Sequence, residues 1–217
     1  MFEINTIESG IFHIYNRGVN GNNIFHDEQD HWRFLESLRV FNSDLGICDP
    51  ISFSKRCHCL YPTANRLVEI HQFALLPNHF HMLIQEKTEG GISKFIQRLK
   101  TSYSKYINKK YSRRGHFFES TYHSRLINSD SYLEHITRYI HLNPLNLFNI
   151  DWKHSNIENK IDALHNLASY RWSSFYYYFN QIDQTFLDLS LLKQFFPTAI
   201  DHVKYLFEYQ PTDNTFF

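Results

Sequence analysis

Residues 67–85 read LVEIHQFALLPNHFHMLIQ, and this stretch decides the fold. Leu67–Leu76 and His79–Gln85 are two strand-like runs, rich in valine, isoleucine, phenylalanine and leucine. Pro77 and Asn78 between them form a turn pair, because proline presets a turn backbone and asparagine tolerates one. The stretch therefore predicts two consecutive strands separated by a turn.

Strand and helix signals continue on both sides of this stretch. Gly10–Arg17 alternates like a strand, and Asp27–Phe41 carries apolar residues at helical spacing. Downstream, Ile92–Tyr111 has one apolar stripe, His116–Ile127 is strand-like and Asp130–Asn143 is a helical pattern that ends before a proline. The order predicts an α+β fold, a ferredoxin-like (RRM-like) sandwich with an antiparallel sheet and helices on one face.

The C-terminal part has a different pattern. It contains an aromatic segment, Tyr170–Phe179, and two short helical patterns near Leu187–Phe195 and Ile200–Tyr209. We therefore expect residues 1–149 to form the sandwich domain and residues 150–217 to form a helical extension packed on it.

Composition narrows the class of protein. The chain is 42% hydrophobic, which is enough for a core and too much for a disordered protein. No apolar run approaches the roughly 18–20 residues of a membrane span, and the start MFEINTIESG lacks the features of a signal peptide. Three cysteines are too few for a disulfide framework. We expect a cytoplasmic protein without a membrane partner.

The charge is balanced but unevenly spread. The 22 Lys+Arg equal the 22 Asp+Glu, yet residues 92–118 hold eight basic residues and no acid. Such a stretch suits a phosphate backbone. Alternatively, these basic residues could simply be the solvent-exposed side of a helix, with no binding function.

Two clusters of residues could carry chemistry. His79 and His81 are two apart in a strand, so both imidazoles would face one side and could donate nitrogens to one divalent metal. Tyr139 and Asn143 are four apart on a helix, so the amide could add an oxygen ligand while the phenol reaches what the metal polarises. Each cluster also has a purely structural explanation, since H-x-H arises by chance among 14 histidines and asparagine before proline is a common helix stop.

Taken together, four segments resemble the single-tyrosine HUH transposases, the transposase IS200-like family. They are, in chain order, PNHFHML, ISKFIQRLKTSYSKYIN, GHFFESTYHSRLI and YLEHITRYIHLNP. Two further segments, FHIYNRG and YRWSSF, resemble the REP-associated tyrosine transposase branch, which is linked to repetitive extragenic palindromes. The resemblance covers roughly Ile11 to Tyr178.

The resemblance implies roles for four residues. His79 and His81 match the HUH pair that binds a divalent ion, expected to be Mg²⁺ or Mn²⁺, and Tyr139 matches the nucleophile. Asn143 stands where a polar residue, often glutamine in relatives, completes the metal site, and it is one methylene shorter. The implied activity is that of a DNA transposase or endonuclease, which cleaves and rejoins single-stranded, hairpin-flanked DNA through a 5′-phosphotyrosine intermediate.

The implied partners are single-stranded DNA hairpins and palindromic repeats, and we expect the cytoplasmic protein to be nucleoid-associated when it is bound to DNA. One tyrosine supports one covalent link per subunit, so two concurrent strand joins would need a homodimer, and relatives occur both as monomers and as dimers. The candidate DNA contacts lie on the basic helix and at strand ends: Asn16, Arg17, Lys94, Arg98, Lys100, Lys105, Lys109 and Arg125. Trp172 could stack on a base or belong to the core.

Two other functions fit the same fold. A non-catalytic nucleic-acid-binding module would use the histidines and tyrosine structurally, and a metal-dependent phosphodiesterase would use water in place of Tyr139. The irregular segment Asp49–Asn65 reads as a loop or insertion. With His58, the three cysteines Cys48, Cys57 and Cys59 invite a zinc site, but the C-x-C spacing is unusual for one and free thiols are the simpler interpretation.

Overall fold

The computed structural model describes residues 10–43 and 65–208, and its centre is an antiparallel sheet. Within these residues the strand order is β2-β3-β1-β4. The strands are β1 (Ile11–Arg17), β2 (Val68–Leu76), β3 (His79–Glu86) and β4 (His123–Leu126). The predicted α+β sandwich is confirmed. The predicted insertion Asp49–Asn65, except for Asn65, lies outside the described residues, and so do Cys48, Cys57, His58 and Cys59.

The quoted stretch forms the β2–β3 pair of the sheet. Its register runs from Val68 opposite Glu86 to Leu76 opposite His79, with an irregularity between Ile70 and Gln72. The carbonyl of Pro77 in the turn accepts hydrogen bonds from the backbone N–H groups of Ile24 and Phe25. Nearly every residue of β2 is buried, because both faces of this strand are covered.

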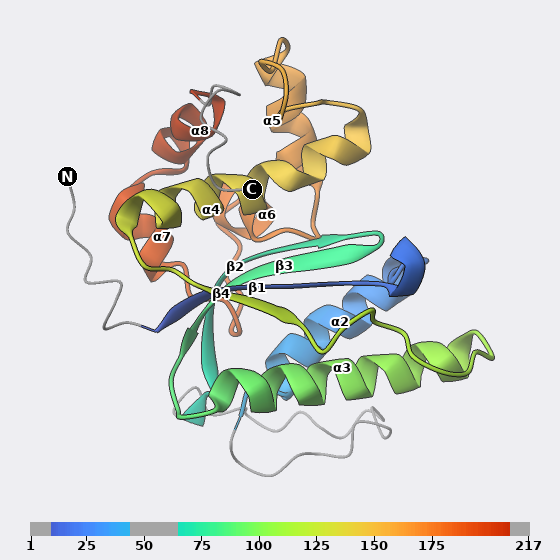
Figure 1. Cartoon of the computed structure of the whole chain (residues 1–217). Helices are drawn as coiled ribbons and strands as arrows, with labels where there is room; N and C mark the ends of the chain where they lie inside the picture. Colours follow the sequence, from blue (N-terminus) through green and yellow to red (C-terminus); the bar gives the residue numbers. More distant parts are fainter. Residues whose placement is uncertain (1–9, 44–64, 209–217) are drawn as a thin grey trace.

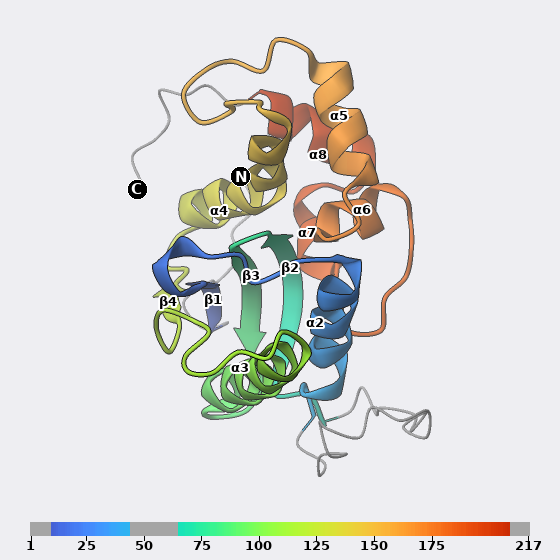
Figure 2. The ribbon, with the colours of Figure 1, turned by 90° about the vertical axis from the view of Figure 1, so that its right-hand side faces the viewer.

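Two helices cover one face of the sheet, as predicted (Figures 1 and 2). They are α2 (Glu28–Val40) and α3 (Gly91–Lys110). The buried residues of α3 include Ile92, Phe95 and Leu99, which belong to the predicted apolar stripe. They pack with Ile14, Phe80 and Met82 of the sheet in one large core.

The opposite face of the sheet is covered as well, which the sequence analysis did not predict (Figures 1 and 2). Its helices are α4 (Asp130–Leu142), α5 (Lys160–Ser169), α6 (Ser174–Phe179), α7 (Ser190–Phe195) and α8 (Ala199–Phe207). One buried cluster joins Leu83 of β3 to Ile136 of α4 and to Phe175 of α6. The short 3-10 helix η3 (Asn143–Phe148) continues directly from α4. The division at residue 150 stays a prediction.

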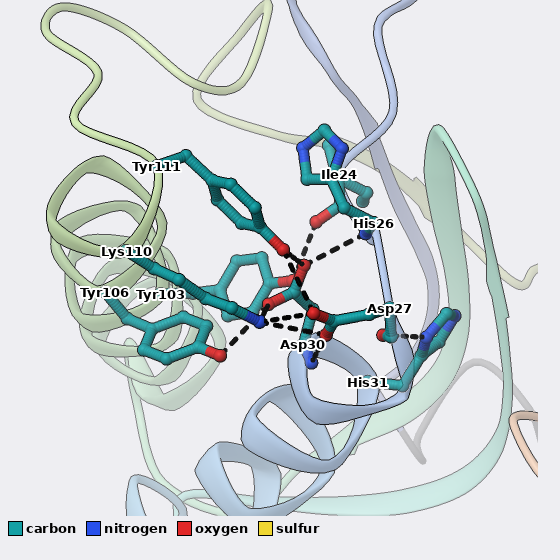
Figure 3. Close-up of polar contacts among 9 residues, drawn as sticks. All are labelled: Ile24, His26, Asp27, Asp30, His31, Tyr103, Tyr106, Lys110 and Tyr111. Carbon is teal, nitrogen blue, oxygen red and sulfur yellow. Dashed lines mark hydrogen bonds and ion pairs between the residues drawn. The ribbon is translucent and has the colours of Figure 1, made fainter.

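A polar cluster ties the start of α2 to the end of α3 (Figure 3). Asp27 caps α2 by accepting from the backbone N–H of Asp30. The fully buried Asp30 carboxylate accepts hydrogen bonds from Tyr106 and Tyr111 and pairs with Lys110 at 2.8 Å. These contacts fix the two helices on their face of the sheet.

Two sequence expectations concern single features. Trp172 is 8% exposed and stacks on His31 at 4.5 Å between ring centroids, which favours its core interpretation. Within the described part of the chain, none of the helices combines the length and apolarity needed to cross a membrane.

Candidate active site

His79 and His81 lie on the face of β3 that α4 covers. The alternation of the strand sends Phe80 and Met82 into the opposite core, as their spacing predicts. The two imidazole rings lie 5.1 Å apart between centroids and are nearly perpendicular. Strand geometry therefore places both rings side by side on one surface.

Each histidine of the pair is held through its Nδ1 atom. The Nδ1 of His81 lies 2.9 Å from Nε2 of His13, and the Nδ1 of His79 lies 2.6 Å from Oδ1 of Asn78. Among the described residues, neither ring has a hydrogen-bond partner at Nε2. Each ring is held in place by a contact at Nδ1, and its Nε2 is left available. This arrangement suits a pair of metal ligands.

Tyr139 of α4 faces these histidines. Its ring centroid is 5.1 Å from that of His81, with the two planes perpendicular, and 6.3 Å from that of His13. On another side of the phenol lie the ring of Trp152, at 5.8 Å, and Nζ of Lys153, at 4.8 Å from the centroid. The tyrosine is 8% exposed, so its position is set by packing.

Asn143 lies one helical turn beyond Tyr139, where it caps α4 and is almost fully buried. Its Oδ1 accepts a hydrogen bond of 3.5 Å from Asn146, and its Nδ2 has no partner among the described residues. A buried amide with unmet bonding capacity costs about 1–3 kcal/mol. An amide group can exchange its oxygen and nitrogen by rotation, so Asn143 has the chemistry of an oxygen ligand.

The residues present fit a divalent ion only with a mixed ligand set. Within residues 10–43 and 65–208, no three His, Cys, Asp or Glu side chains are grouped as a metal site. A third ligand from the chain would therefore be of another type, and the amide oxygen of Asn143 has the required chemistry.

The electrostatics of the site are positive. Burial lowers the pKa of His13 to about 3, helped by Arg125, and lowers the pKa of His79 to about 4, helped by Lys153 and Arg17. Burial together with His13, His79 and Lys153 lowers the pKa of His81 well below its ordinary value. The rings are therefore neutral at pH 7, the form that binds metals, and the surrounding charges suit a phosphate.

Two of the predicted DNA contacts lie beside this site. Arg17 ends β1 in an exposed position, paired with His79 in the sheet register. Arg125 is exposed on β4, opposite His13. By contrast, the buried Asn16 donates its amide N–H groups to the backbone carbonyls of Ser120 and Thr121, which gives it a structural role.

The basic helix α3 lies on the other side of the sheet from α4, the helix that contains Tyr139 (Figures 1 and 2). Its residues Lys94, Lys105 and Lys109 are exposed. Arg98 donates to the carbonyl of Ser43 at 2.8 Å, and Lys100 donates to that of Ser120 at 2.5 Å, its pKa lowered to about 8 by burial. A groove of about 1040 Å³ lies between α3 and residues 115–122. The predicted DNA contacts thus form two separate groups.

The sequence analysis missed three residues of the site. His13 belongs to a segment quoted for the resemblance, but its contact with His81 spans 68 residues and depends on the pairing of β1 with β3. Trp152 and Lys153 follow η3, and nothing in their local pattern indicates that they return to Tyr139. Strand alternation could have placed His13 on a sheet face but could not have shown which residue it meets.

Comparison with known proteins finds a matching family model and a solved structure of similar fold. Residues 59–143 match the family model described as "Transposase IS200 like". The fold matches a solved structure described as "Structure of the REP associates tyrosine transposase bound to a REP hairpin", with a TM-score of 0.50 and 13% identity. That match covers 88% of this chain and 93% of the other. None of the curated proteins compared with the chain matches it.

These findings support a transposase role for the protein. More narrowly, residues 59–143 are similar to the IS200-like transposases, and the fold is similar to that of a REP-associated tyrosine transposase. The resemblance predicted from the sequence is confirmed. The matched segment contains His79, His81, Tyr139 and Asn143.

Proposed function

We propose that this protein cleaves and rejoins single-stranded DNA through a covalent link to Tyr139. The observation that carries the proposal is the perpendicular packing of the Tyr139 ring against His81, 5.1 Å between centroids, with His79 beside it. A nucleophile and a metal ligand pair must both reach one phosphate, and the closeness of these three rings supports such roles for them.

The chemistry follows from these side chains. The phenol oxygen of Tyr139 attacks phosphorus, the bond to the 3′ oxygen breaks, the phenol loses a proton and the leaving oxygen gains one. The products are a 5′-phosphotyrosine link and a free 3′-OH, and attack by a second 3′-OH reverses the step without ATP. His79, His81 and Asn143 would hold Mg²⁺ or Mn²⁺, which when bound supplies Lewis-acid stabilisation of charge at the phosphate.

The proposed substrate is hairpin-forming single-stranded DNA. The solved relative is described as bound to a REP hairpin, which supports this class of DNA for a chain of the same fold. Arg17 and Arg125 would contact the backbone at the site. The exposed Lys94, Lys105 and Lys109 of α3 would contact a more distant part of the same DNA, and Arg98 and Lys100 would add charge there. Because each chain offers one Tyr139, two concurrent joins would need a second copy.

The test uses oligonucleotides that contain the hairpin repeats flanking the gene, incubated with Mn²⁺ or Mg²⁺. Products are run on a denaturing gel for the wild type, Tyr139→Phe and Tyr132→Phe, a control two turns earlier on α4. We expect a metal-dependent protein–DNA adduct that disappears only in Tyr139→Phe. Cleavage that persists without adduct in Tyr139→Phe would indicate a phosphodiesterase that uses water. Tight binding with neither product would indicate a non-catalytic module.

A further inference from the structure

A row of neighbouring rings, stacked at every contact except the tilted pair His81–Tyr15, leads away from the active site across the sheet. The ring of His81 on β3 is followed by that of Tyr15 on β1, 5.7 Å away, and by that of His123 on β4, a further 4.8 Å away. His13 stacks on both His81 and Tyr15, at 5.1 and 5.0 Å. The sheet register explains the row, because Tyr15 is directly opposite His81 on one side and His123 on the other.

The row is buried at one end and open at the other. His81 and His13 are almost fully buried, Tyr15 is half-buried and His123 is exposed. Since β4 is an edge strand, the inner face of the His123 ring stacks on Tyr15 and its outer face points past the edge of the sheet. The 4.8 Å step equals the spacing of neighbouring strands, so one more flat ring would continue the row.

The open end is also positively charged. Arg125 is two residues from His123 on the same face of β4, and its charge reaches the site, where it lowers the pKa of His13. Arg17 is two residues from Tyr15, and its charge helps to lower the pKa of His79. A flat apolar face between two guanidinium groups complements a nucleobase with a phosphate on each side.

We propose that His123 and Tyr15 form a stacking site for one unpaired nucleobase of the DNA strand next to the phosphate that Tyr139 attacks. Arg125 holds the backbone phosphate of that nucleotide. The site reads the flat face of the base, so it prefers unpaired over paired DNA and discriminates little among bases. The proposal rests on the proposed function, because it takes single-stranded DNA at this site as the substrate.

The experiment measures base stacking in the full chain with Tyr139→Phe, which blocks any covalent step. A hairpin oligonucleotide carries 2-aminopurine, in turn, at each unpaired position near the cleaved phosphate, and its fluorescence is quenched where it stacks. The variants are His123→Ala, His123→Trp, which keeps a ring, and His165→Ala, an exposed histidine of α5. His123 is exposed, so its replacement leaves the fold intact, and thermal unfolding checks this.

We expect one position to be quenched, and His123→Ala to remove this quenching and weaken binding about tenfold. His123→Trp retains both, and His165→Ala changes neither. With an abasic nucleotide at that position, wild type and His123→Ala bind equally. Equal binding of the intact strand by wild type and His123→Ala would overturn the proposal. So would an effect of His123→Ala that is the same with and without the base, or that comes from a changed oligomeric state.

The outcome separates this proposal from the proposed function. If wild type forms the Tyr139 adduct but no base stacks on His123, the stacking site is wrong and the reaction stands. If a base stacks in a His123-dependent way but no adduct forms, the stacking site stands and the covalent reaction is wrong.

Discussion

The Nε2 of His13 lies 2.9 Å from the Nδ1 of His81, and the two rings are stacked 5.1 Å apart. The contact runs diagonally across the sheet, because the residue directly opposite His81 on β1 is Tyr15. If the Nε2 of His81 binds a metal ion, its Nδ1 carries the proton and donates to His13. His13 therefore fixes both the tautomer and the direction of a metal ligand.

The first prediction tests this orientation. We expect His13→Ala to weaken Mn²⁺ binding about 10–100-fold, which is the usual effect of losing a partner behind a ligating histidine. His13→Gln restores part of the affinity, because its amide oxygen can accept from His81. Isothermal titration of Mn²⁺ measures the change, with His165→Ala as control. An unchanged affinity in His13→Ala would contradict this role.

The second prediction concerns Lys153, whose Nζ lies 4.8 Å from the centroid of the Tyr139 ring. Its charge also helps to lower the pKa of His79 and of His81. In the proposed reaction, a cation in this place would stabilise the charge that builds on the phosphate as the phenol attacks. We expect Lys153→Met, which keeps the apolar stem, to slow adduct formation at saturating DNA about tenfold or more.

The measurement for Lys153 separates rate from binding. Single-turnover adduct formation gives the rate, and fluorescence anisotropy of the same oligonucleotide gives the affinity. Lys160→Met, at the exposed start of α5, is the matched control. A loss of affinity with an unchanged rate at saturation would show that Lys153 only holds the backbone.

The sequence predicts those parts of the fold that are determined by residues close together along the chain. The turn at Pro77-Asn78 and the apolar stripe of α3 are both local patterns, and both are present. The covering of the second sheet face is not local. Helix α4 is amphipathic like α3, and its apolar side alone does not say which face of the sheet it meets.

In the candidate site, too, some features follow from local sequence patterns and others depend on long-range pairing. The shared face of His79 and His81 and the spacing of Tyr139 and Asn143 follow from strand and helix periods. The stacking of Tyr15 on His123 depends on the pairing of β1 with β4, more than 100 residues apart. The sequence predicts Asn16 as a DNA contact from its place at a strand end. In the structure it is buried and bonded to two carbonyls, which local sequence does not indicate, and its contact with DNA stays a prediction.

The third prediction concerns the cluster in Figure 3. Hydrogen bonds from Lys110 lower the pKa of Asp27 despite opposing burial, and the buried Asp30 pairs with the same ammonium. Removing the cation leaves the Asp30 carboxylate with only neutral donors. We expect Lys110→Met to lower the free energy of unfolding by about 3 kcal/mol. Urea unfolding measures this, and the exposed Lys109→Met should leave the midpoint within error. Equal midpoints for the two variants would contradict the prediction.

The last prediction concerns a buried link between α4 and the C-terminal helices. His141 of α4 lies 3.1 Å from His202 of α8 and 2.7 Å from the hydroxyl of Ser174 on α6, measured between the polar atoms. Burial lowers the pKa of His141 to about 3, and burial with His141 and Arg138 lowers the pKa of His202 well below its ordinary value. Both imidazoles are therefore neutral in the folded chain.

The sign of the pH dependence follows from these shifts. Below about pH 6.5 the unfolded chain binds a proton at each of these histidines and the folded chain does not, so stability is full above 6.5 and falls as the pH is lowered. Below that pH, each buried histidine lowers the free energy of unfolding by about 1.4 kcal/mol per pH unit. Between pH 7.5 and pH 5 the loss is about 2 kcal/mol, because it begins only at about pH 6.5. His202→Gln removes one titrating group.

Urea unfolding at a series of pH values between 7.5 and 5 gives the measurement. We expect the loss of stability on acidification to be about 2 kcal/mol smaller in His202→Gln than in the wild type, whatever the variant costs at pH 7.5. His165→Gln, at an exposed position on α5, is the matched control. Parallel slopes for wild type and His202→Gln would mean that His202 accepts a proton in the folded chain, and the neutral link between α4 and α8 would be wrong.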